Sequence, residues 1–367
     1  MKRVLCIVGG MNAGGAETFL MKIYRSLDRS RYQMDFAVGI KGKGYYDDEI
    51  SSLGGRIIHI VPKSEGVYNN FCSIKKLVKE EKYDYVLRTS QHSLSALELF
   101  AARLGGAKIA AFRSSNTNTT TPGGRDLILH KICSFMPKLF ANVRIAPSTE
   151  AAEYMFGKNS VKLGKAHLLH NGVDLSVFKY NANHRNEIRK ELDIENRLVI
   201  GHVGRFTEQK NHSFLIEIFY EIKKIREDAV LVLVGEGELL EVVREKVNSL
   251  GLENSVIFTG IRKDIPELMS SFDLFVFPSF YEGMPNTIIE AQATGLPCLI
   301  SDSITKEADI TGLVRYESLN KSACDWANCV CKMEWNKKRR NTTEDFIQNK
   351  YDIDSVVAEF LRLLCMQ

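Results

Sequence analysis

The sequence predicts an α/β protein of two doubly wound domains, and three observations support this expectation. The chain has 367 residues, which exceeds a typical single domain, so two domains of roughly 170 residues each are expected. Short apolar runs alternate with amphipathic stretches, as in parallel sheets covered by helices on both faces. The alternation breaks around residues 170–197 and then restarts. We therefore expect domains at 1–178 and 179–345, followed by a C-terminal helix at 346–367.

The strands expected in the first half are short apolar runs. They are Val4–Val8, Met34–Ile40, Arg56–Val61, Tyr85–Thr89, Lys108–Arg113 and Val143–Pro147. Between the first two, Glu17–Leu27 has apolar residues at helical spacing, which predicts an amphipathic helix.

The second half repeats the pattern after the break. Its expected strands are Leu198–Val203, Val230–Val234, Val256–Phe258, Leu274–Phe277 and Pro297–Ile300, and its expected helices are Ser213–Arg226, Glu238–Leu250 and Asn286–Thr294. A final amphipathic helix, Ile353–Leu364, has an apolar face that could pack on either domain, including the first.

Composition indicates a cytoplasmic globular protein. Apolar residues make up 44% and charged residues 26% of the chain, and no apolar run approaches the roughly 20 residues of a membrane helix. The eight cysteines are scattered without zinc-site spacing, so we expect reduced thiols and no bound metal.

Charge is uneven along the chain. Residues 1–178 contain 25 Lys and Arg against 15 Asp and Glu, a net charge of +10, whereas the whole chain is only +4. A basic first half suits an anionic partner, either an acidic lipid surface at the inner membrane or a pyrophosphate-linked acceptor. A surface bias without function explains the count equally well. We expect no nucleic-acid partner.

The most informative segment is Glu282–Glu290, which follows the apolar run Leu274–Phe277. A strand, a Gly-Met-Pro-Asn turn and a helix start in succession form an anion site, because the first N–H groups of a helix are unpaired. Glu290 is placed to accept hydrogen bonds from a ribose, and Glu282 is free to face a second group. The segment predicts a site for a sugar nucleotide.

Two further turns follow expected strands. Gly9–Glu17 is rich in glycine, which allows close approach of a ligand, but it does not fit G-x-G-x-x-G, so a nicotinamide enzyme is disfavoured. In Gly201–Asn211, Arg205 and Lys210 lie five residues apart beyond a strand end and can reach a diphosphate from two sides.

These motifs together resemble the retaining glycosyltransferases of family 4. The resemblance rests on Gly14–Glu17, Asn171–Asp174, Gly204–Asn211, Val234–Gly237 and Glu282–Ala291, in order and spacing, and covers nearly the whole chain. It implies the GT-B fold, in which two Rossmann-like domains face each other. The segment Ile300–Glu307 resembles the branch that assembles capsular polysaccharide and exopolysaccharide.

The resemblance also implies roles for individual residues. Arg205 and Lys210 would neutralise the donor diphosphate, Glu290 would hold the ribose, and Glu282 would contact the transferred sugar as a catalytic residue. Backbone amides would complete the donor site, and Ile261 would lie along the base. The residues that would form this part of the donor site are Gly14, Gly15, Gly283, Met284, Pro285 and Asn286, of which Pro285 has no N–H to donate. No metal or other cofactor would be required, and a UDP-type donor is favoured.

One departure concerns a histidine that family members usually carry after the fourth strand of the first domain. Here His92 is displaced from that place by several residues. Either His92 takes the catalytic role, or Arg88, Arg113 and the Ser/Asn loop containing Asn116 make the acceptor contacts.

The resemblance implies a hexosyltransferase that extends a growing, lipid-linked glycan in cell-surface polysaccharide biosynthesis, with retention of configuration. Two alternatives stay open. A GT-B epimerase would turn over donor without acceptor, and a non-catalytic sugar-nucleotide binder in an assembly would not turn it over at all. A phosphorylase is disfavoured, because no lysine pocket for pyridoxal phosphate is evident.

Overall fold

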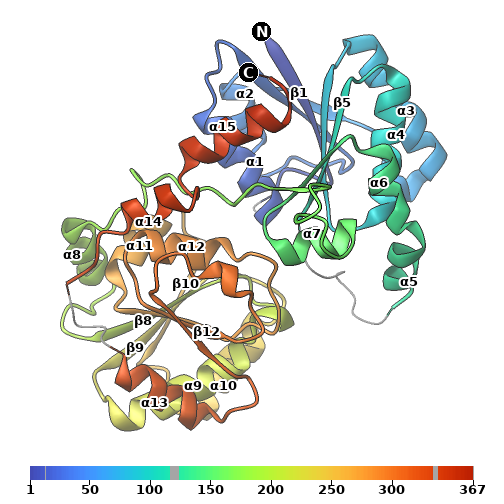
Figure 1. The fold of residues 1–367 in the computed structure, drawn as a ribbon. Helices are drawn as coiled ribbons and strands as arrows, with labels where there is room; N and C mark the ends of the chain where they lie inside the picture. The colour runs from blue at the N-terminus through green and yellow to red at the C-terminus, as the bar shows by residue number, and fades with distance from the viewer. Residues whose placement is uncertain (13, 116–123, 334–337, 367) are drawn as a thin grey trace. The chain divides into compact units, whose positions relative to one another are not determined.

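The computed structural model describes residues 1–12, 14–115, 124–333 and 338–366 (Figure 1). They form two compact units, one of residues 1–172 with 350–367 and one of residues 173–349. None of the described helices has the length and apolar character needed to span a membrane.

The first unit contains a sheet of seven parallel strands in the order β3-β2-β1-β4-β5-β6-β7. The strands are β1 (Lys2–Val8), β2 (Tyr32–Val38), β3 (Ile57–His59), β4 (Tyr85–Ser90), β5 (Ile109–Ser114), β6 (Val143–Ala146) and β7 (His167–Leu168). Its helices are α1 (Gly15–Ser26), α2 (Asp47–Ser52), α3 (Val67–Glu81), α4 (Ala96–Gly105), α5 (Arg125–Ile132), α6 (Met136–Phe140), α7 (Thr149–Phe156) and α15 (Ile353–Leu363), with short 3₁₀ turns η1 (Lys63–Glu65), η2 (Ser93–Ser95) and η3 (Cys133–Phe135).

Alternating side chains of β1 explain why both faces of this sheet are covered. Val4 and Cys6 pack in a core with α1 and α15, whereas Leu5 and Ile7 pack with α3, α4 and α7. The final helix therefore belongs to the first unit, where Val356 and Phe360 are buried and α15 lies beside α1 (Figure 1). The Lys2 ammonium also donates to the carbonyl of Met366 at 2.6 Å. Of the placements that the sequence left open, the structure therefore has the last helix on the first unit.

The second unit contains six parallel strands in the order β10-β9-β8-β11-β12-β13. They are β8 (Leu198–Val203), β9 (Ala229–Val234), β10 (Val256–Gly260), β11 (Leu274–Phe277), β12 (Cys298–Ser301) and β13 (Val314–Glu317). The helices are α8 (Ala182–Glu191), α9 (His212–Ile225), α10 (Leu240–Ser249), α11 (Ile265–Ser271), α12 (Asn286–Ala293), α13 (Ala323–Lys332) and α14 (Thr343–Gln348), with 3₁₀ turns η4 (Glu208–Lys210) and η5 (Lys306–Ala308).

The predicted fold class is confirmed, since both sheets are parallel and each order reverses beside its first strand. Two edge strands, β7 and β13, were not predicted from the sequence. The expected break at 170–197 contains α8, whose surface is too polar for an apolar stripe to reveal it. The unit boundaries fall a few residues from the expected domain limits.

Candidate functional site

An ion pair joins the two main motifs of the second unit. Lys210 lies at the end of η4, and its Nζ is 2.6 Å from Oε1 of Glu282 in the turn after β11. The ammonium also lies 4.6 Å from the ring centroid of Phe277, the last residue of that strand. Both charged side chains are largely buried, so the pair is held in a partly desolvated environment.

Hydrogen bonds hold the two loops together around this pair. The Gln209 side chain donates to the carbonyl of Tyr281 at 2.8 Å, and its own carbonyl accepts from the amide of Phe280 at 2.9 Å. Asn211, in the left-handed region with φ of 55°, donates from its side chain to Pro278. The η4 segment and the turn after β11 therefore act as one structural element.

Glycines allow a second loop to pack against the first. Gly235 has φ of 136°, and a Cβ at this position would clash with the carbonyl oxygen of Gly204. The amide of Phe206 donates to the carbonyl of Glu236 at 3.0 Å. The packing leaves Arg205 with a side chain 74% exposed and only a 3.6 Å contact with Glu238, so its guanidinium faces solvent.

Helix α12 begins directly after the turn that carries Glu282. Asn286 is its first residue, and Pro285 precedes it as N-cap. Among the described residues, no side chain caps this helix, and Oδ1 of Asn286 is buried without a partner. The start of α12 therefore keeps the anion-binding character of a helix N-terminus.

The remaining residues predicted for donor binding lie around the same sheet edge, except for those of the first unit. Gly283, Met284 and Pro285 are buried, and Glu290 is buried one turn into α12. Ile261, just after β10, is 64% exposed. Lys210 and Glu282 are thus in direct contact, whereas Ile261 presents an apolar side chain to solvent.

Two buried histidines beside Lys210 escaped the sequence reasoning. His202, on β8, and His212, the first residue of α9, lie with ring centroids 4.6 Å apart. Nδ1 of His202 contacts the carbonyl oxygen of Val276 at 2.9 Å. Burial lowers the pKa of His202 to about 4 and that of His212 to about 2, and the charge of Lys210 acts in the same direction. Both rings are therefore neutral.

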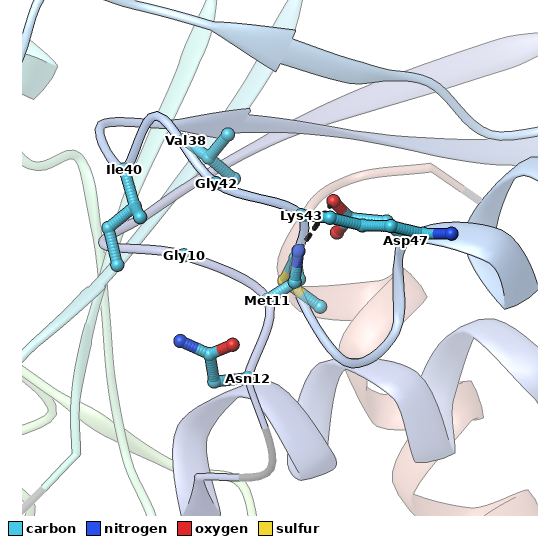
Figure 2. Close-up of a pocket in the computed structure, with 9 residues that line it drawn as sticks. Gly10, Met11, Asn12, Val38, Ile40, Gly42, Lys43 and Asp47 are labelled. Carbon is cyan, nitrogen blue, oxygen red and sulfur yellow. Dashed lines mark hydrogen bonds between the residues drawn. The ribbon is translucent and has the colours of Figure 1, made fainter.

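In the first unit, the glycine turn leads into α1. Gly14 is the N-cap of α1, Gly15 is its first residue, and Ala13 lies outside the described residues. Burial raises the pKa of Glu17, whose carboxylate folds back toward Gly14. A small pocket opens beside the turn, and Asn12 and Ile40 lie on one side of it (Figure 2). The Asp47 carboxylate, which also lines this pocket, accepts a hydrogen bond from the amide of Gly44 at 2.8 Å.

His92 follows β4 and lies at the start of η2. Its Nδ1 accepts from the amide of Leu94 at 3.1 Å, and its ring is 5.5 Å from that of His130 on α5. His130 is buried and stacks on Tyr154, and Ser93 donates to its Nδ1. Burial lowers the pKa of His130, with a further contribution from His92. His92 thus caps a turn.

The arginines considered for acceptor contacts both point into the first unit. Arg88 pairs with Glu98 and donates to the carbonyl of Ile7 at 2.9 Å. Arg113 is 2% exposed, stacks over Phe19 at 3.6 Å and donates to Oδ1 of Asn171 at 2.6 Å. Burial lowers the pKa of Arg113 to about 9. Asn116 lies outside the described residues.

Comparison with known proteins agrees with this geometry. The model of Glycosyltransferase Family 4 matches residues 13–177, and that of Glycosyl transferases group 1 matches residues 184–352. A putative glycosyltransferase of Bacillus subtilis, EpsF, is 35% identical over 99% of this chain and 96% of its own length. The chain belongs to glycosyltransferase family 4.

Two further comparisons extend the picture. This family 4 glycosyltransferase is 32% identical, over 63% of its chain and 60% of the relative, to the UDP-Gal:alpha-D-GlcNAc-diphosphoundecaprenol alpha-1,3-galactosyltransferase of Escherichia coli. Its structure resembles that of HepE from Anabaena, solved in complex with UDP, with a TM-score of 0.80 at 18% identity over the whole of both chains. The likeness shows the GT-B fold, as expected from the sequence.

Proposed function

We propose that this glycosyltransferase moves a hexose from a UDP-type sugar nucleotide to a growing, lipid-linked glycan of a cell-surface polysaccharide, with retention of configuration. The observation that carries the proposal is the Lys210–Glu282 ion pair beside the uncapped start of α12. It provides one cation, one carboxylate and a helix N-terminus at a single sheet edge. One relative, named for a UDP-Gal donor and a diphosphoundecaprenol-linked acceptor, supports the donor and acceptor classes.

The transfer exchanges two bonds at one carbon. The bond between the anomeric carbon and the β-phosphate oxygen breaks, and its electron pair leaves with the diphosphate. The acceptor hydroxyl oxygen bonds to the same face of that carbon, and its proton passes to the departing phosphate oxygen. Front-side attack of this kind retains the configuration and requires no nucleophilic carboxylate.

In this proposal, charge on the departing diphosphate is stabilised by the protein. Lys210 and the N-terminus of α12 provide positive potential from partly buried positions, and exposed Arg205 can close over the phosphates. Glu290 holds the ribose and Glu282 contacts the transferred hexose. These groups suffice for the leaving-group charge, so we propose that no metal ion takes part.

A panel of nucleotide sugars tests the proposal. A bound donor raises the melting temperature according to its concentration relative to Kd, so a UDP-sugar should stabilise the protein more than its GDP or ADP counterpart. The stabilising donor is then incubated with and without a lipid-linked acceptor, and the anomeric configuration of the product is read by NMR. An inverted product would refute retention, and conversion of donor alone to an isomeric sugar nucleotide would indicate an epimerase.

A further inference from the structure

The helical segment from α5 to α6 carries large apolar side chains on its outward side. Ile128, Ile132, Phe135 and Leu139 are 61%, 65%, 53% and 60% exposed. They recur at intervals of four, three and four residues, which places them along one side of successive helical turns. Residues between them, His130, Cys133 and Pro137, are buried. A helix on a protein surface normally has the opposite polarity.

Basic side chains surround this apolar stripe. Lys131 and Lys138 are exposed within the segment itself. Helix α4 neighbours α6 (Figure 1). Its Arg103 donates to the carbonyl of Leu139 at 3.5 Å, and Arg144 donates to the carbonyl of Lys138 at 2.5 Å. None of these four cations forms an ion pair with a carboxylate among the residues that the structure describes.

A loop extends the same surface. Arg144 also donates to the carbonyl of Lys165 at 3.1 Å, which ties the loop after α7 to the end of α6. Residues 157–165 contain three lysines and no acidic residue. Leu163, between two of them, is 61% exposed. The loop thus repeats the combination of apolar and basic side chains.

We propose that this surface, formed by residues 127–140 and 157–165, docks the enzyme on an anionic lipid bilayer. An interfacial helix buries its apolar side chains at the boundary between headgroups and acyl chains, while lysines and arginines contact anionic headgroups. A second copy of the chain fits less well. In a two-fold symmetric dimer the same surface would face itself and bring its unpaired cations together. The inference does not depend on the proposed reaction, since docking requires neither donor nor acceptor.

Sedimentation with vesicles tests the docking. The full chain is mixed with vesicles of phosphatidylcholine alone, or with equal parts of phosphatidylglycerol added. We expect binding to the anionic vesicles only, weakened by salt. A variant with Ile132→Ser, Phe135→Ser and Leu139→Ser should lose measurable binding. A variant with Lys131→Gln and Lys138→Gln should bind about thirtyfold more weakly, because each basic residue near an anionic surface contributes roughly fivefold.

Control variants carry the same kinds of substitution at positions outside the proposed docking surface. Ile225→Ser, Val242→Ser and Ile347→Ser replace apolar side chains of similar exposure in the second unit. Lys75→Gln and Lys79→Gln replace exposed lysines on α3. Both sets should bind as the wild type does. Equal binding by all variants, or no binding by the wild type, would overturn the proposal.

A second measurement locates the contact. Tryptophan introduced as Phe135→Trp should be quenched by brominated phosphatidylcholine in anionic vesicles, whereas Val242→Trp should not be. Light scattering after gel filtration, without lipid, tests whether a second copy of the chain occupies this surface instead. A wild-type dimer that becomes monomeric in the Ile132→Ser, Phe135→Ser, Leu139→Ser variant, with no quenching of the tryptophan at 135, would assign the surface to self-association and refute docking on lipid.

Discussion

Lys210 and Glu282 form an ion pair of 2.6 Å across 72 residues of sequence. The motifs suggested separate partners for them, a diphosphate for the lysine and a sugar for the glutamate. Without a ligand each neutralises the other, so the site does not hold an isolated buried charge, which would be costly. On donor binding, we expect the contact between Lys210 and Glu282 to be replaced by contacts of Lys210 with the diphosphate and of Glu282 with the sugar.

Lys210→Ala should lower kcat/KM for transfer by roughly 100–1000-fold, because it removes a cation that stabilises the leaving diphosphate. Stability should fall by about 1–3 kcal/mol, since Glu282 is left without its partner. Steady-state kinetics and urea unfolding measure the two effects. Glu282→Gln, which keeps the shape of the side chain, should also impair transfer. Full activity in both variants would refute the assigned site.

Glu290→Gln should weaken donor binding by about tenfold, as expected for losing a charge-assisted hydrogen bond worth about 1.5 kcal/mol. Titration of the variant with the stabilising UDP-sugar measures this directly. Glu245→Gln, an exposed change on α10, is the matched control and should leave the affinity unaltered. An unchanged affinity in Glu290→Gln would contradict a ribose contact.

Gly235→Ala should destabilise the protein by at least ~2 kcal/mol, because φ of 136° is strained for alanine and its Cβ would clash with the Gly204 carbonyl. Donor affinity should fall as well, since the shifted loop carries Arg205. Gly42→Ala introduces a Cβ into open space and serves as the control. Equal melting temperatures for the two variants would show that the close packing of these loops is dispensable.

Acid should destabilise the second unit through its two buried histidines. Their pKa values, about 4 for His202 and about 2 for His212, lie below the ~6.5 of an unfolded chain. The unfolded state therefore binds more protons below pH ~6.5, and stability falls as pH drops from there toward pH 4. Each histidine should contribute a slope of about 1.4 kcal/mol per pH unit.

His212→Leu removes one of these titrating groups and should reduce the acid slope. Urea unfolding of both proteins between pH 7 and pH 5 measures the difference. Parallel curves would mean that His212 is protonated equally in the folded and unfolded states.

The spacing of apolar residues along the sequence predicted most of the fold, because buried strands of a parallel sheet are apolar on both faces and appear as continuous apolar runs. Leu198–Val203 and Leu274–Phe277 were predicted with the bounds that the structure gives. The edge strand β13 is only partly buried, and its sequence Val-Arg-Tyr-Glu lacks such a run. Helix α8 is held by polar contacts instead, as in the 2.6 Å bond from Arg189 to Asp273.

The site was predictable as a set of motifs but not as a set of contacts. Strand ends of a parallel sheet lie along one edge, and this topology places the Lys210 and Glu282 motifs together. Whether a side chain turns outward or inward depends on partners distant in sequence. Arg113 points inward because its guanidinium stacks on Phe19 and donates a hydrogen bond to Asn171. The buried ring of His202 has a hydrogen-bonding partner in the carbonyl oxygen of Val276.

The return of α15 to the first unit has a consequence for the modular organisation of the chain. Both termini belong to one unit, and residues 173–349 form a single uninterrupted insertion within it. One continuous gene segment therefore encodes the inserted unit, whereas two separate segments encode its host. A protein truncated before residue 350 would lose Val356 and Phe360 from the core beside α1 and leave apolar surface uncovered. We therefore expect a single-segment gene exchange to transfer the second unit whole and to leave the first unit incomplete.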